Sequence, residues 1–410
     1  MNVVIDDNGG NFIIEKLEDK GFPAFYVGGC VRDSILGRAV FDYDITTAAK
    51  PDDVMRIFSE EKIVTSGIKH GTVTVILNGK PYEVTTFRKE GKYSDNRHPD
   101  RVFFCRNVND DLSRRDFTCN AMAYCKKQGL IDNYGGFYDT HNHVLRAVGV
   151  PATRFKEDAL RMLRALRFSS ALSFSIEKRT ADAVVSQRHL LRNVSAERIY
   201  GELKKIFCGE NALNVLLEFA DVIAMLVYPY ADFRREKYDS AVRACCSAQG
   251  AFELKFAVFC YTLYGGDLPR VLKLLDNFKA DNYIKKIFSV LFVNADLFFG
   301  GTEVSPKRLL RKIYPEFYEE FFIFAKAASC GNSSDIRRVE RLKLDCDGII
   351  GRQECFTLKT LAVNGNDLKS IGIVGKNSGV VLEFLLGLVI DGKAENDKNE
   401  LLRIAKESVL

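Results

Sequence analysis

Two short stretches, Gly28-Gly29-Cys30-Val31-Arg32-Asp33 and Asp42-Tyr43-Asp44, decide how this chain is interpreted. The glycine pair follows an apolar run at residues 24–27 and precedes a predicted helix. Glycine lets the backbone approach a ligand closely, and a helix N-terminus offers free N–H groups to an anion. The pattern therefore predicts a strand, a glycine turn and a helix that together form a phosphate site.

Asp42 and Asp44 carry the second prediction. On a strand, they would project from the same face because side chains alternate. Two carboxylates so close repel each other unless a cation lies between them. Oxygen ligands suit Mg²⁺, which usually takes one or two carboxylates plus substrate phosphates. Glu83, on a further predicted strand, is either a third metal carboxylate or a plain surface residue. The metal and phosphate sites together indicate nucleotide chemistry.

The bulk properties narrow the class of protein. A chain of 410 residues is too long for one core and predicts about two to four domains. With 47% hydrophobic and 28% charged residues, it is neither disordered nor fibrous. The net charge of +5 allows a nucleic-acid partner without demonstrating one. Eleven scattered cysteines predict reduced thiols in the cytoplasm rather than zinc binding. No apolar run is long enough for a membrane span, so we expect no membrane protein.

The composition changes near residue 150. Before that point, strands are predicted at residues 72–77 and 82–87, on either side of the hairpin turn Asn78-Gly79-Lys80. Further elements expected there are strands at 130–133 and 144–148 and helices at 12–19, 31–36 and 52–58. The first part is therefore predicted to be α+β with a mixed sheet.

From residue 150 onward the pattern is helical. Pro151 suits the first position of a helix that is expected to continue to residue 170. Ser195 precedes another predicted helix at 196–207. We expect boundaries near residues 210 and 335. The polar, charged stretch 88–100 is predicted to be a functional loop beside the carboxylate-bearing sheet.

Arg114-Arg115-Asp116-Phe117-Thr118 is a second candidate binding cluster. An arginine fork matches phosphate in a bidentate manner, and an aspartate can accept hydrogen bonds from ribose hydroxyls. The alternative is a local ion pair at a helix start, which contributes little on a surface. Beside Gly28-Gly29 and Asp42, the nucleotide-binding interpretation is preferred.

A third cluster lies in the stretch 157–167. On a continuous helix, Asp158, Arg161 and Arg164 are spaced by three and would form one polar stripe. A carboxylate accepts from an exocyclic amino group and a guanidinium donates to a ring acceptor, so Asp158 with Arg161 could read the edge that cytosine and adenine share. The alternative is an ordinary surface salt bridge.

Together these motifs resemble the bacterial class II tRNA nucleotidyltransferases, the enzymes that add CCA to tRNA 3′ ends. The resemblance covers residues 22–208 in the family's order, and its motifs are Gly28-Gly29-Cys30-Val31-Arg32-Asp33, Asp42-Tyr43-Asp44, Glu83-Val84-Thr85-Thr86-Phe87-Arg88, Arg97-His98-Pro99, Arg114-Arg115-Asp116-Phe117-Thr118-Cys119-Asn120-Ala121, residues 154–168, and Ser195-Ala196-Glu197-Arg198-Ile199. It implies a nucleotidyltransferase head (palm) at 1–149, then an all-α neck at 150–210, body at 211–335 and tail at 336–410.

The resemblance also implies partners and roles. The substrates would be CTP, ATP and the 3′ end and acceptor arm of tRNA, with Mg²⁺ as cofactor and no obligate protein partner. A two-metal transfer would release pyrophosphate, with catalytic roles for Asp42, Asp44 and Arg115. The loop at 88–100 would act in the final AMP step. Metal ligation is implied for Asp42 and Asp44, with Glu83 undecided, and nucleotide binding for Gly28, Gly29, Arg32, Arg115, Asp116, Glu157, Asp158, Arg161, Arg164 and Arg167.

Alternatives stay open on the sequence. A poly(A) polymerase, or an enzyme that adds only CC or only A, shares the motifs of the head. A catalytically inactive RNA-binding protein is a different class, which the intact carboxylates disfavour. Paired basic residues are candidate RNA phosphate contacts, although each pair is equally explained as a solvated helix face: Lys204-Lys205, Arg234-Arg235, Lys307-Arg308, Arg311-Lys312 and Arg337-Arg338.

Overall fold

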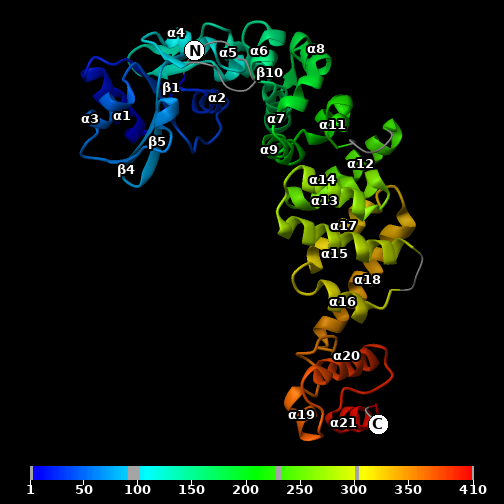
Figure 1. Ribbon diagram of the computed structural model, residues 1–410. Helices are drawn as coiled ribbons and strands as arrows, with labels where there is room; N and C mark the ends of the chain where they lie inside the picture. The colour runs from blue at the N-terminus through cyan, green and yellow to red at the C-terminus, as the bar shows by residue number, and fades with distance from the viewer. Residues whose placement is uncertain (1–2, 91–101, 228–232, 301–303, 409–410) are drawn as a thin grey trace. The chain divides into compact units, whose positions relative to one another are not determined.

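The computed structural model describes residues 3–90, 102–227, 233–300 and 304–408. The chain divides into two compact units, Met1–Pro229 and Tyr230–Leu410. The first unit contains a seven-stranded sheet with helices followed by further helices, and the second unit is helical in its described part (Figure 1). The predicted fold class, an α+β first part with a mixed sheet followed by helices, is confirmed.

The sheet has the strand order β3-β4-β5-β2-β1-β8-β9. Strands β2 and β5 are parallel, with Asp44 opposite Glu83, and every other neighbouring pair is antiparallel. The sheet is therefore mixed. Its strands are β1 (Ala24–Val27), β2 (Asp44–Thr47), β3 (Lys62–Val64), β4 (Thr72–Leu77), β5 (Lys80–Thr86), β8 (Ala123–Cys125) and β9 (Gly129–Ile131).

The predicted hairpin joins β4 to β5. Leu77 lies opposite Lys80, so the loop consists of two residues. Its residues Asn78 and Gly79 have φ values of 51° and 80°. Positive φ at both central positions is the turn that matches the twist of antiparallel strands, and asparagine followed by glycine adopts it at little cost. The strand prediction at 72–77 is confirmed, and that at 82–87 matches β5 with a shift of its ends.

Helices α1 (Asn8–Asp19), α2 (Gly29–Ile35) and α3 (Pro51–Ile57) confirm the three helices predicted in this part, each with an earlier start. Helix α1 begins earlier because the Asp7 carboxylate accepts the N–H of Gly10 and also forms an ion pair with Lys80, at 2.7 Å. Phe25, Tyr26 and Phe58 are among the buried residues of the core. The remaining short helices are α4 (Val108–Ser113), α5 (Gly136–His141) and two 3₁₀ turns, Ile68–His70 and Thr118–Asn120.

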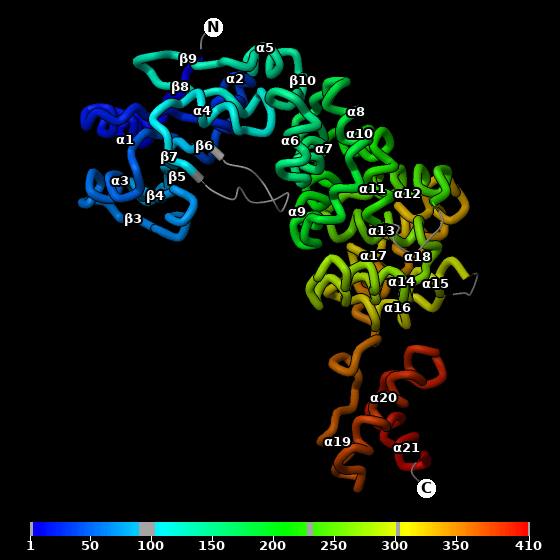
Figure 2. The backbone as a smooth tube through the Cα atoms, turned by 45° about the horizontal axis from the view of Figure 1, so that its top comes forward, coloured from blue at the N-terminus to red at the C-terminus, as the bar shows by residue number. Residues whose placement is uncertain are grey.

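A separate ribbon follows the sheet. Strand β6 (Arg88–Glu90) pairs antiparallel with β7 (Val102–Phe104), and the two lie side by side in Figure 2. The rest of the predicted loop at 88–100, including His98-Pro99, lies outside the described residues.

The prediction of one helix from Pro151 to residue 170 is wrong. The structure has α6 (Pro151–Glu157) and α7 (Leu160–Leu172), separated at Asp158. The backbone of Asp158 is extended (φ −138°, ψ 106°), and its carboxylate accepts the N–H of Leu160 at 3.1 Å. An aspartate that bonds to the nearby backbone competes with helix continuation, which explains the break.

The other elements of the first unit are helical apart from one short strand pair. Strand β10 (Val144–Leu145) is parallel to β11 (Ser175–Ile176). The predicted helix at 196–207 is confirmed as α9, preceded by Ser195. The remaining helices are α8 (Lys178–Gln187), a 3₁₀ turn (Arg188–Asn193), α10 (Ala212–Glu218) and α11 (Ala220–Val227).

The second unit is built on aromatic side chains. Phe256, Phe288, Phe292 and Phe324 are fully buried, and their rings form a chain of stacked and tilted contacts. A separate apolar cluster extends from Cys355 to Ala405. The helices are α12 (Arg235–Ser247), α13 (Phe252–Tyr264), α14 (Leu268–Asn277), α15 (Asn282–Phe299), α16 (Pro306–Ile313), α17 (Tyr318–Ala328), α18 (Ser333–Gly351), α19 (Gly365–Ser370), α20 (Lys376–Ile390) and α21 (Lys398–Ser408).

The predicted boundary at 335–336 falls inside α18, and the division into four domains stays a prediction. Within the described residues, no helix is both long and apolar enough to cross a membrane.

Candidate active site

Gly28 forms the turn between β1 and α2. Its φ of 77° and ψ of −127° belong to a region that residues with a Cβ rarely adopt. A Cβ at this position would lie 3.1 Å from Nη1 of Arg115. The backbone conformation therefore favours the glycine predicted from the sequence, and a Cβ at this position would also be in tight contact with Arg115.

Replacing Gly28 by alanine tests these two requirements. We expect Gly28→Ala to lower the free energy of unfolding by about 1–3 kcal/mol and to reduce catalytic activity strongly, because Arg115 must move. Gly375→Ala is a matched control. Gly375 also precedes a helix, has similar angles (φ 67°, ψ −141°), and a Cβ there meets nothing within 4 Å. Chemical denaturation and a nucleotide incorporation assay measure both effects. Equal activity of the two variants would contradict the role of the close approach.

The candidate metal carboxylates lie at the start of β2. Asp44 is the first residue of this strand and is exposed, whereas Ile45 to Thr47 are buried. Asp42 is also exposed but precedes the strand, so the prediction that both aspartates lie on a strand is wrong for Asp42. The pairing of β2 with β5 begins at Asp44, so Asp42, two residues earlier, lies outside the sheet. Glu83, opposite Asp44 on the parallel strand β5, is exposed as well.

The carboxylates interact electrostatically. Partial removal of Asp44 from water raises its pKa above the ordinary value, and the negative charges of Glu83 and Asp42 raise it further, while Arg115 lowers it. A carboxyl whose ionised form is disfavoured by its neighbours gains stability from a cation. Within the described residues, no three His, Cys, Asp or Glu side chains are arranged as a ready-made metal cluster. Mg²⁺ in proteins commonly completes its ligand set with water and substrate phosphates.

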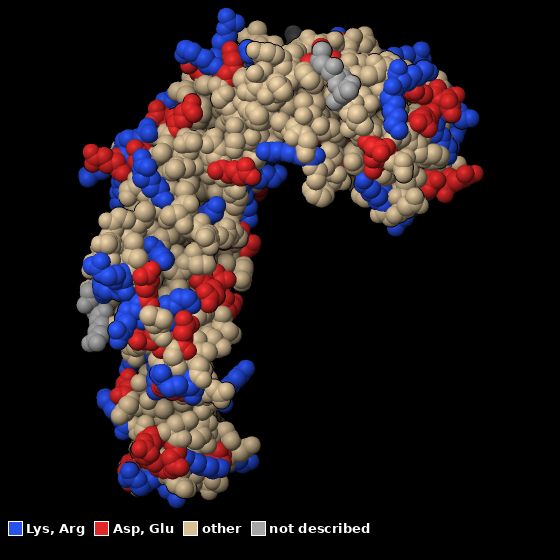
Figure 3. Space-filling view, turned by 180° about the vertical axis from the view of Figure 1, so that it is seen from behind, with Lys and Arg blue, Asp and Glu red and all other residues tan. Residues whose placement is uncertain are grey.

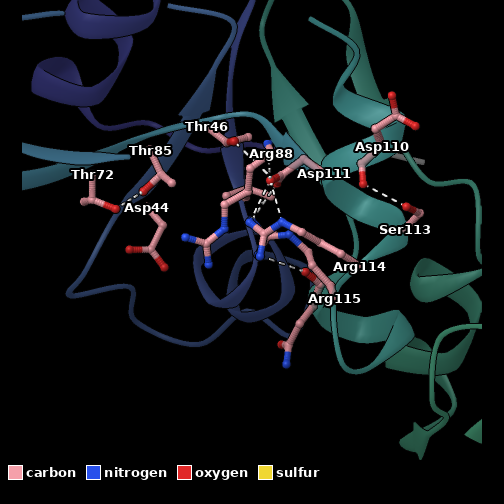
Figure 4. A network of polar contacts seen from close by, with 12 residues as sticks. Asp44, Thr46, Thr72, Thr85, Arg88, Asp110, Asp111, Ser113, Arg114 and Arg115 are labelled. Carbon is pink, nitrogen blue, oxygen red and sulfur yellow. Dashed lines mark hydrogen bonds and ion pairs between the residues drawn. The ribbon is translucent and has the colours of Figure 1, made fainter. Parts of the chain in front are cut away.

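Arg115 interacts electrostatically with the Asp44 carboxylate. Its Nη2 donates to Asp111 at 3.2 Å, and its Nη1 lies 3.5 Å from the carbonyl oxygen of Asn120. Figure 4 shows Arg115 and Asp111 in one polar network, with Asp44 nearby. The Nε atom of Arg115 is buried and has no hydrogen-bond partner in the described part of the chain. Arg115 is therefore held on one edge and retains donors for a ligand.

Arg32 and Asp116 are joined through one asparagine. Arg32 donates through Nη1 to Asn120 at 2.7 Å, and it forms an ion pair with Asp33. Asn120 in turn donates to Asp116 at 3.3 Å, and Arg164 donates to Asp116 through Nε at 2.8 Å. Burial would raise the pKa of Asp116, but the charge and hydrogen bonds of Arg164 lower it to about 2. Asp116 is thus ionised and fixes Arg164.

The base-reading candidates Asp158 and Arg161 each have a partner of their own in the structure. Arg161 donates to Glu157 at 2.7 Å and to the carbonyl oxygen of Arg114 at 3.1 Å. Asp158 instead accepts from Arg198 of α9, at 3.1 Å. The predicted stripe on one continuous helix is wrong, because the helix is interrupted at Asp158, and Asp158, Arg161 and Arg164 bond to Arg198, Glu157 and Asp116 respectively.

Three guanidinium groups surround the ring of Phe168 on α7. The distances to its centroid are 4.2 Å for Arg167 and 5.5 Å each for Arg32 and Arg164. Arg167 also forms an ion pair with Glu202 of α9, at 3.3 Å. The structure thus brings Arg164 and Arg167 of α7 together with Arg32 of α2 around one aromatic ring, and their binding of a nucleotide stays a prediction.

Sequence reasoning assigned no role to four residues that hold this site, although Asn120, Arg198 and Glu202 belong to the motifs on which the family resemblance rests. Asp111 lies three and four residues before Arg114 and Arg115, a spacing that signals a helical ion pair. The other three act across long sequence separations, and only the structure reveals their roles: Asn120, Arg198 and Glu202.

Comparison with known proteins agrees with this geometry. Residues 24–146 match the poly A polymerase head domain, and residues 173–221 match a probable RNA and SrmB-binding site of polymerase A. The CCA-adding enzyme of Lactobacillus helveticus is 47% identical over 95% of this chain and 94% of its own length. That of Ligilactobacillus salivarius is 35% identical over 96% and 95%. The Bacillus stearothermophilus CCA-adding enzyme in complex with CTP has a TM-score of 0.76 and 30% identity, covering 97% of this chain and 96% of its own.

The fold and these matches define a nucleotidyltransferase. The chain belongs to the family of CCA-adding enzymes, the tRNA nucleotidyltransferases. The family predicted from the motifs is thereby confirmed, and a poly(A) polymerase or an enzyme that adds only CC or only A is not favoured. Membership of a nucleotidyltransferase family also implies a divalent metal cofactor.

Proposed function

We propose that this chain adds C, C and A to the 3′ end of tRNA from CTP and ATP, with Mg²⁺ held by Asp42 and Asp44. The observation that supports the site most directly is the convergence of Asp44, Glu83 and Arg115 beside the Gly28 turn. The all-oxygen donor set suits Mg²⁺. When bound, divalent ions activate the attacking hydroxyl and neutralise the leaving pyrophosphate. Glu83, one strand away, is either a third ligand or a surface residue that repels Asp44.

The triphosphate is proposed to lie along Gly28, Gly29, Arg32 and Arg115. Gly28 provides the close backbone approach, and α2 begins at Gly29. Arg115 keeps donors that Asp111 does not use, and it can orient a phosphate next to Asp44. Together these groups would place the reacting phosphorus beside the carboxylates, and positioning of this kind accounts for much of the catalysis in phosphoryl transfer.

Asp116 is proposed to act on the ribose. Its oxygens already accept from Arg164, from Asn120 and from the N–H of Phe117. A ribose hydroxyl would therefore use a remaining lone pair of this fixed carboxylate. Asp116 consequently links the ribose to Arg164 of α7.

Base reading is proposed for Glu157, Asp158 and Arg161, with Arg164 and Arg167 completing the pocket. A carboxylate and a guanidinium match the amino group and ring nitrogen that cytosine and adenine share, and they oppose the reversed edges of uracil and guanine. In the structure, Asp158 is engaged by Arg198, and Arg161 by Glu157. Contact with a base would require both residues to share or exchange these partners.

The RNA partner is proposed to be the 3′ end and acceptor arm of tRNA, with no obligate protein partner. Several candidate phosphate contacts are already paired: Lys307 with Glu354, Arg308 with Asp391, Arg311 with Glu383, and Arg338 with Asp335. On the face drawn in Figure 3, basic and acidic side chains are interspersed. RNA contact would therefore use individual arginines and lysines at several places.

The proposed compartment is the cytoplasm, where the eleven free thiols would stay reduced. The proposed domains are a head at 1–149, a neck at 150–210, a body at 211–335 and a tail at 336–410.

Sequencing of the product tests the proposed reaction. A tRNA that lacks its terminal CCA is incubated with the protein, CTP, ATP and Mg²⁺. We expect addition of CCA and then a stop, because side chains of one pocket select the nucleotide. Omission of CTP should prevent addition on this tRNA, whereas a tRNA that ends in CC should accept a single A. A long A tract, or a stop after CC, would contradict the proposal.

A further inference from the structure

Asp111 of α4 is a fully buried carboxylate with several hydrogen bonds. Its Oδ1 accepts from Nε and Nη2 of Arg114, at 3.0 and 2.7 Å, and lies 3.3 Å from the backbone nitrogen of Arg88. Its Oδ2 accepts from Nη2 of Arg115 at 3.2 Å and from the hydroxyl of Thr46 at 3.4 Å. Oδ1 therefore joins Arg114 to strand β6, and Oδ2 joins Arg115 to strand β2.

These partners connect the two strands that carry the acidic side chains. Thr46 lies on β2, two residues after Asp44. Arg88 begins β6, two residues after the end of β5, the strand that contains Glu83. Figure 4 shows Asp111 between Thr46, Arg88 and the two arginines. One carboxylate thus fixes the position of Arg115 relative to the sheet.

We propose that Asp111 is the positioning residue that sets where Arg115 lies relative to Asp44. The inference rests on the proposed role of Arg115 as a ligand of the triphosphate. The same oxygen, Oδ2, bonds to Arg115 and to Thr46 of the Asp44 strand, so only one atom separates the guanidinium from β2. A planar guanidinium that is held at Nη2 has its remaining donors fixed in direction. Displacing such a group by a fraction of an ångström lowers the rate of a reaction that depends on orientation.

The charge of Asp111 is maintained by its partners. Burial would raise its pKa, but the positive charges of Arg115 and Arg114 and their hydrogen bonds lower it below the ordinary value. The carboxylate stays ionised at neutral pH. An asparagine at this position has one oxygen that accepts and one NH₂ group that donates, so it could not accept from both arginines through separate atoms.

A double-mutant cycle tests the positioning role. Asp111→Asn keeps the size of the side chain but removes its charge. We expect kcat/KM for CTP, on a tRNA that lacks CCA, to fall about tenfold or more. In an Arg115→Ala background, the same change should lower kcat/KM by less than about twofold, because the group that Asp111 positions is absent. A merely structural role would give losses that multiply.

Two further variants keep the test decisive. Asp139→Asn is the matched control, since Asp139 is a buried aspartate of α5 that bonds to Arg146 and Thr118. It should lose stability without lowering kcat/KM for CTP. If Asp111→Asn does not fold, Asp111→Glu keeps the charge, shifts Arg115, and should show the same non-additivity.

The outcomes separate the two levels of inference. Unchanged kcat/KM in Arg115→Ala alone would overturn the proposed role of Arg115 and, with it, the positioning role. A loss in Arg115→Ala combined with fully multiplicative losses from Asp111 would overturn the positioning role only.

Discussion

Asp44→Asn is expected to lower the rate of nucleotide incorporation about a thousandfold or more while leaving tRNA binding unchanged. The variant keeps the shape of the side chain but removes the charge that holds the divalent ion. Asp42→Asn should behave in the same way. Single-turnover incorporation of CMP and a filter-binding assay with tRNA measure the two effects. Incorporation at the wild-type rate by either variant would contradict the assignment of the metal carboxylates.

Asp44→Asn should lower activity but raise the stability of the metal-free protein. Folding raises the pKa of Asp44, so the folded metal-free protein binds this proton more tightly than the unfolded chain. The contribution of Asp44 to stability therefore falls as the pH rises above the pKa of Asp44 in the unfolded chain. At neutral pH this contribution is unfavourable. Asp44→Asn removes this cost and should raise Tm in EDTA. Mg²⁺ should raise the Tm of the wild type more than that of the variant, because it binds the folded site.

Two further variants accompany this experiment, of which the first is a control and the second tests the role of Glu83. Asp182→Asn changes an aspartate of α8 whose side chain is 63% exposed, and it should alter neither activity nor Tm. Glu83→Gln separates the two interpretations of Glu83. A loss of incorporation comparable to that of Asp44→Asn would indicate a third metal ligand, whereas near-normal incorporation would indicate a surface residue.

Asp158→Asn is expected to reduce the preference for CTP over UTP about ten- to hundredfold. An asparagine can donate a hydrogen bond to the O4 atom of uracil, which the carboxylate of Asp158 opposes. Incorporation of each of the four triphosphates on a tRNA that lacks CCA measures the preference. The ratio of the rate with UTP to the rate with CTP should therefore be higher in Asp158→Asn than in the wild type.

The control for base reading must preserve the surroundings of Asp158. Asparagine retains an oxygen that can accept the N–H of Leu160, so the start of α7 should stay intact. Asp182→Asn should leave the order of preference unchanged. An equal loss of rate for all four triphosphates in Asp158→Asn would show that Asp158 has a structural role and does not read the base.

Local features of the sequence predicted local structure well. Asn78-Gly79 fixes its own turn through backbone angles that few other residues adopt, and Pro151 begins a helix because its ring presets φ. Most elements predicted in the head are present with shifted ends, but the strand predicted at 144–148 covers only residues 144–145, and β3, β8, α4 and α5 were not predicted. The helix break at Asp158 was not predicted, because an aspartate inside a helical pattern can either continue the helix or accept a nearby backbone N–H, here that of Leu160, and Arg198, 40 residues further along the chain, holds the other carboxylate oxygen.

The candidate site was predicted unevenly for the same reason. The glycines, the paired aspartates and the arginines form recognisable motifs, and the family resemblance connects them. Asp111 was missed because its importance comes from burial against Thr46 and Arg88, which no local pattern reveals. The side-by-side placement of Asp44 and Glu83 depends on a parallel strand pair, whose register is not written in either strand.

The pairing of arginines with internal carboxylates has a consequence for competition among anions. Arg115 and Arg164 are each neutralised by an aspartate before any ligand arrives. A small anion that contacts only one such guanidinium therefore gains little electrostatic energy, even where it binds the donors that the carboxylate leaves unused. A polyanion that contacts several guanidinium groups at once gains more, so small inorganic anions would compete weakly with a nucleoside triphosphate for this pocket.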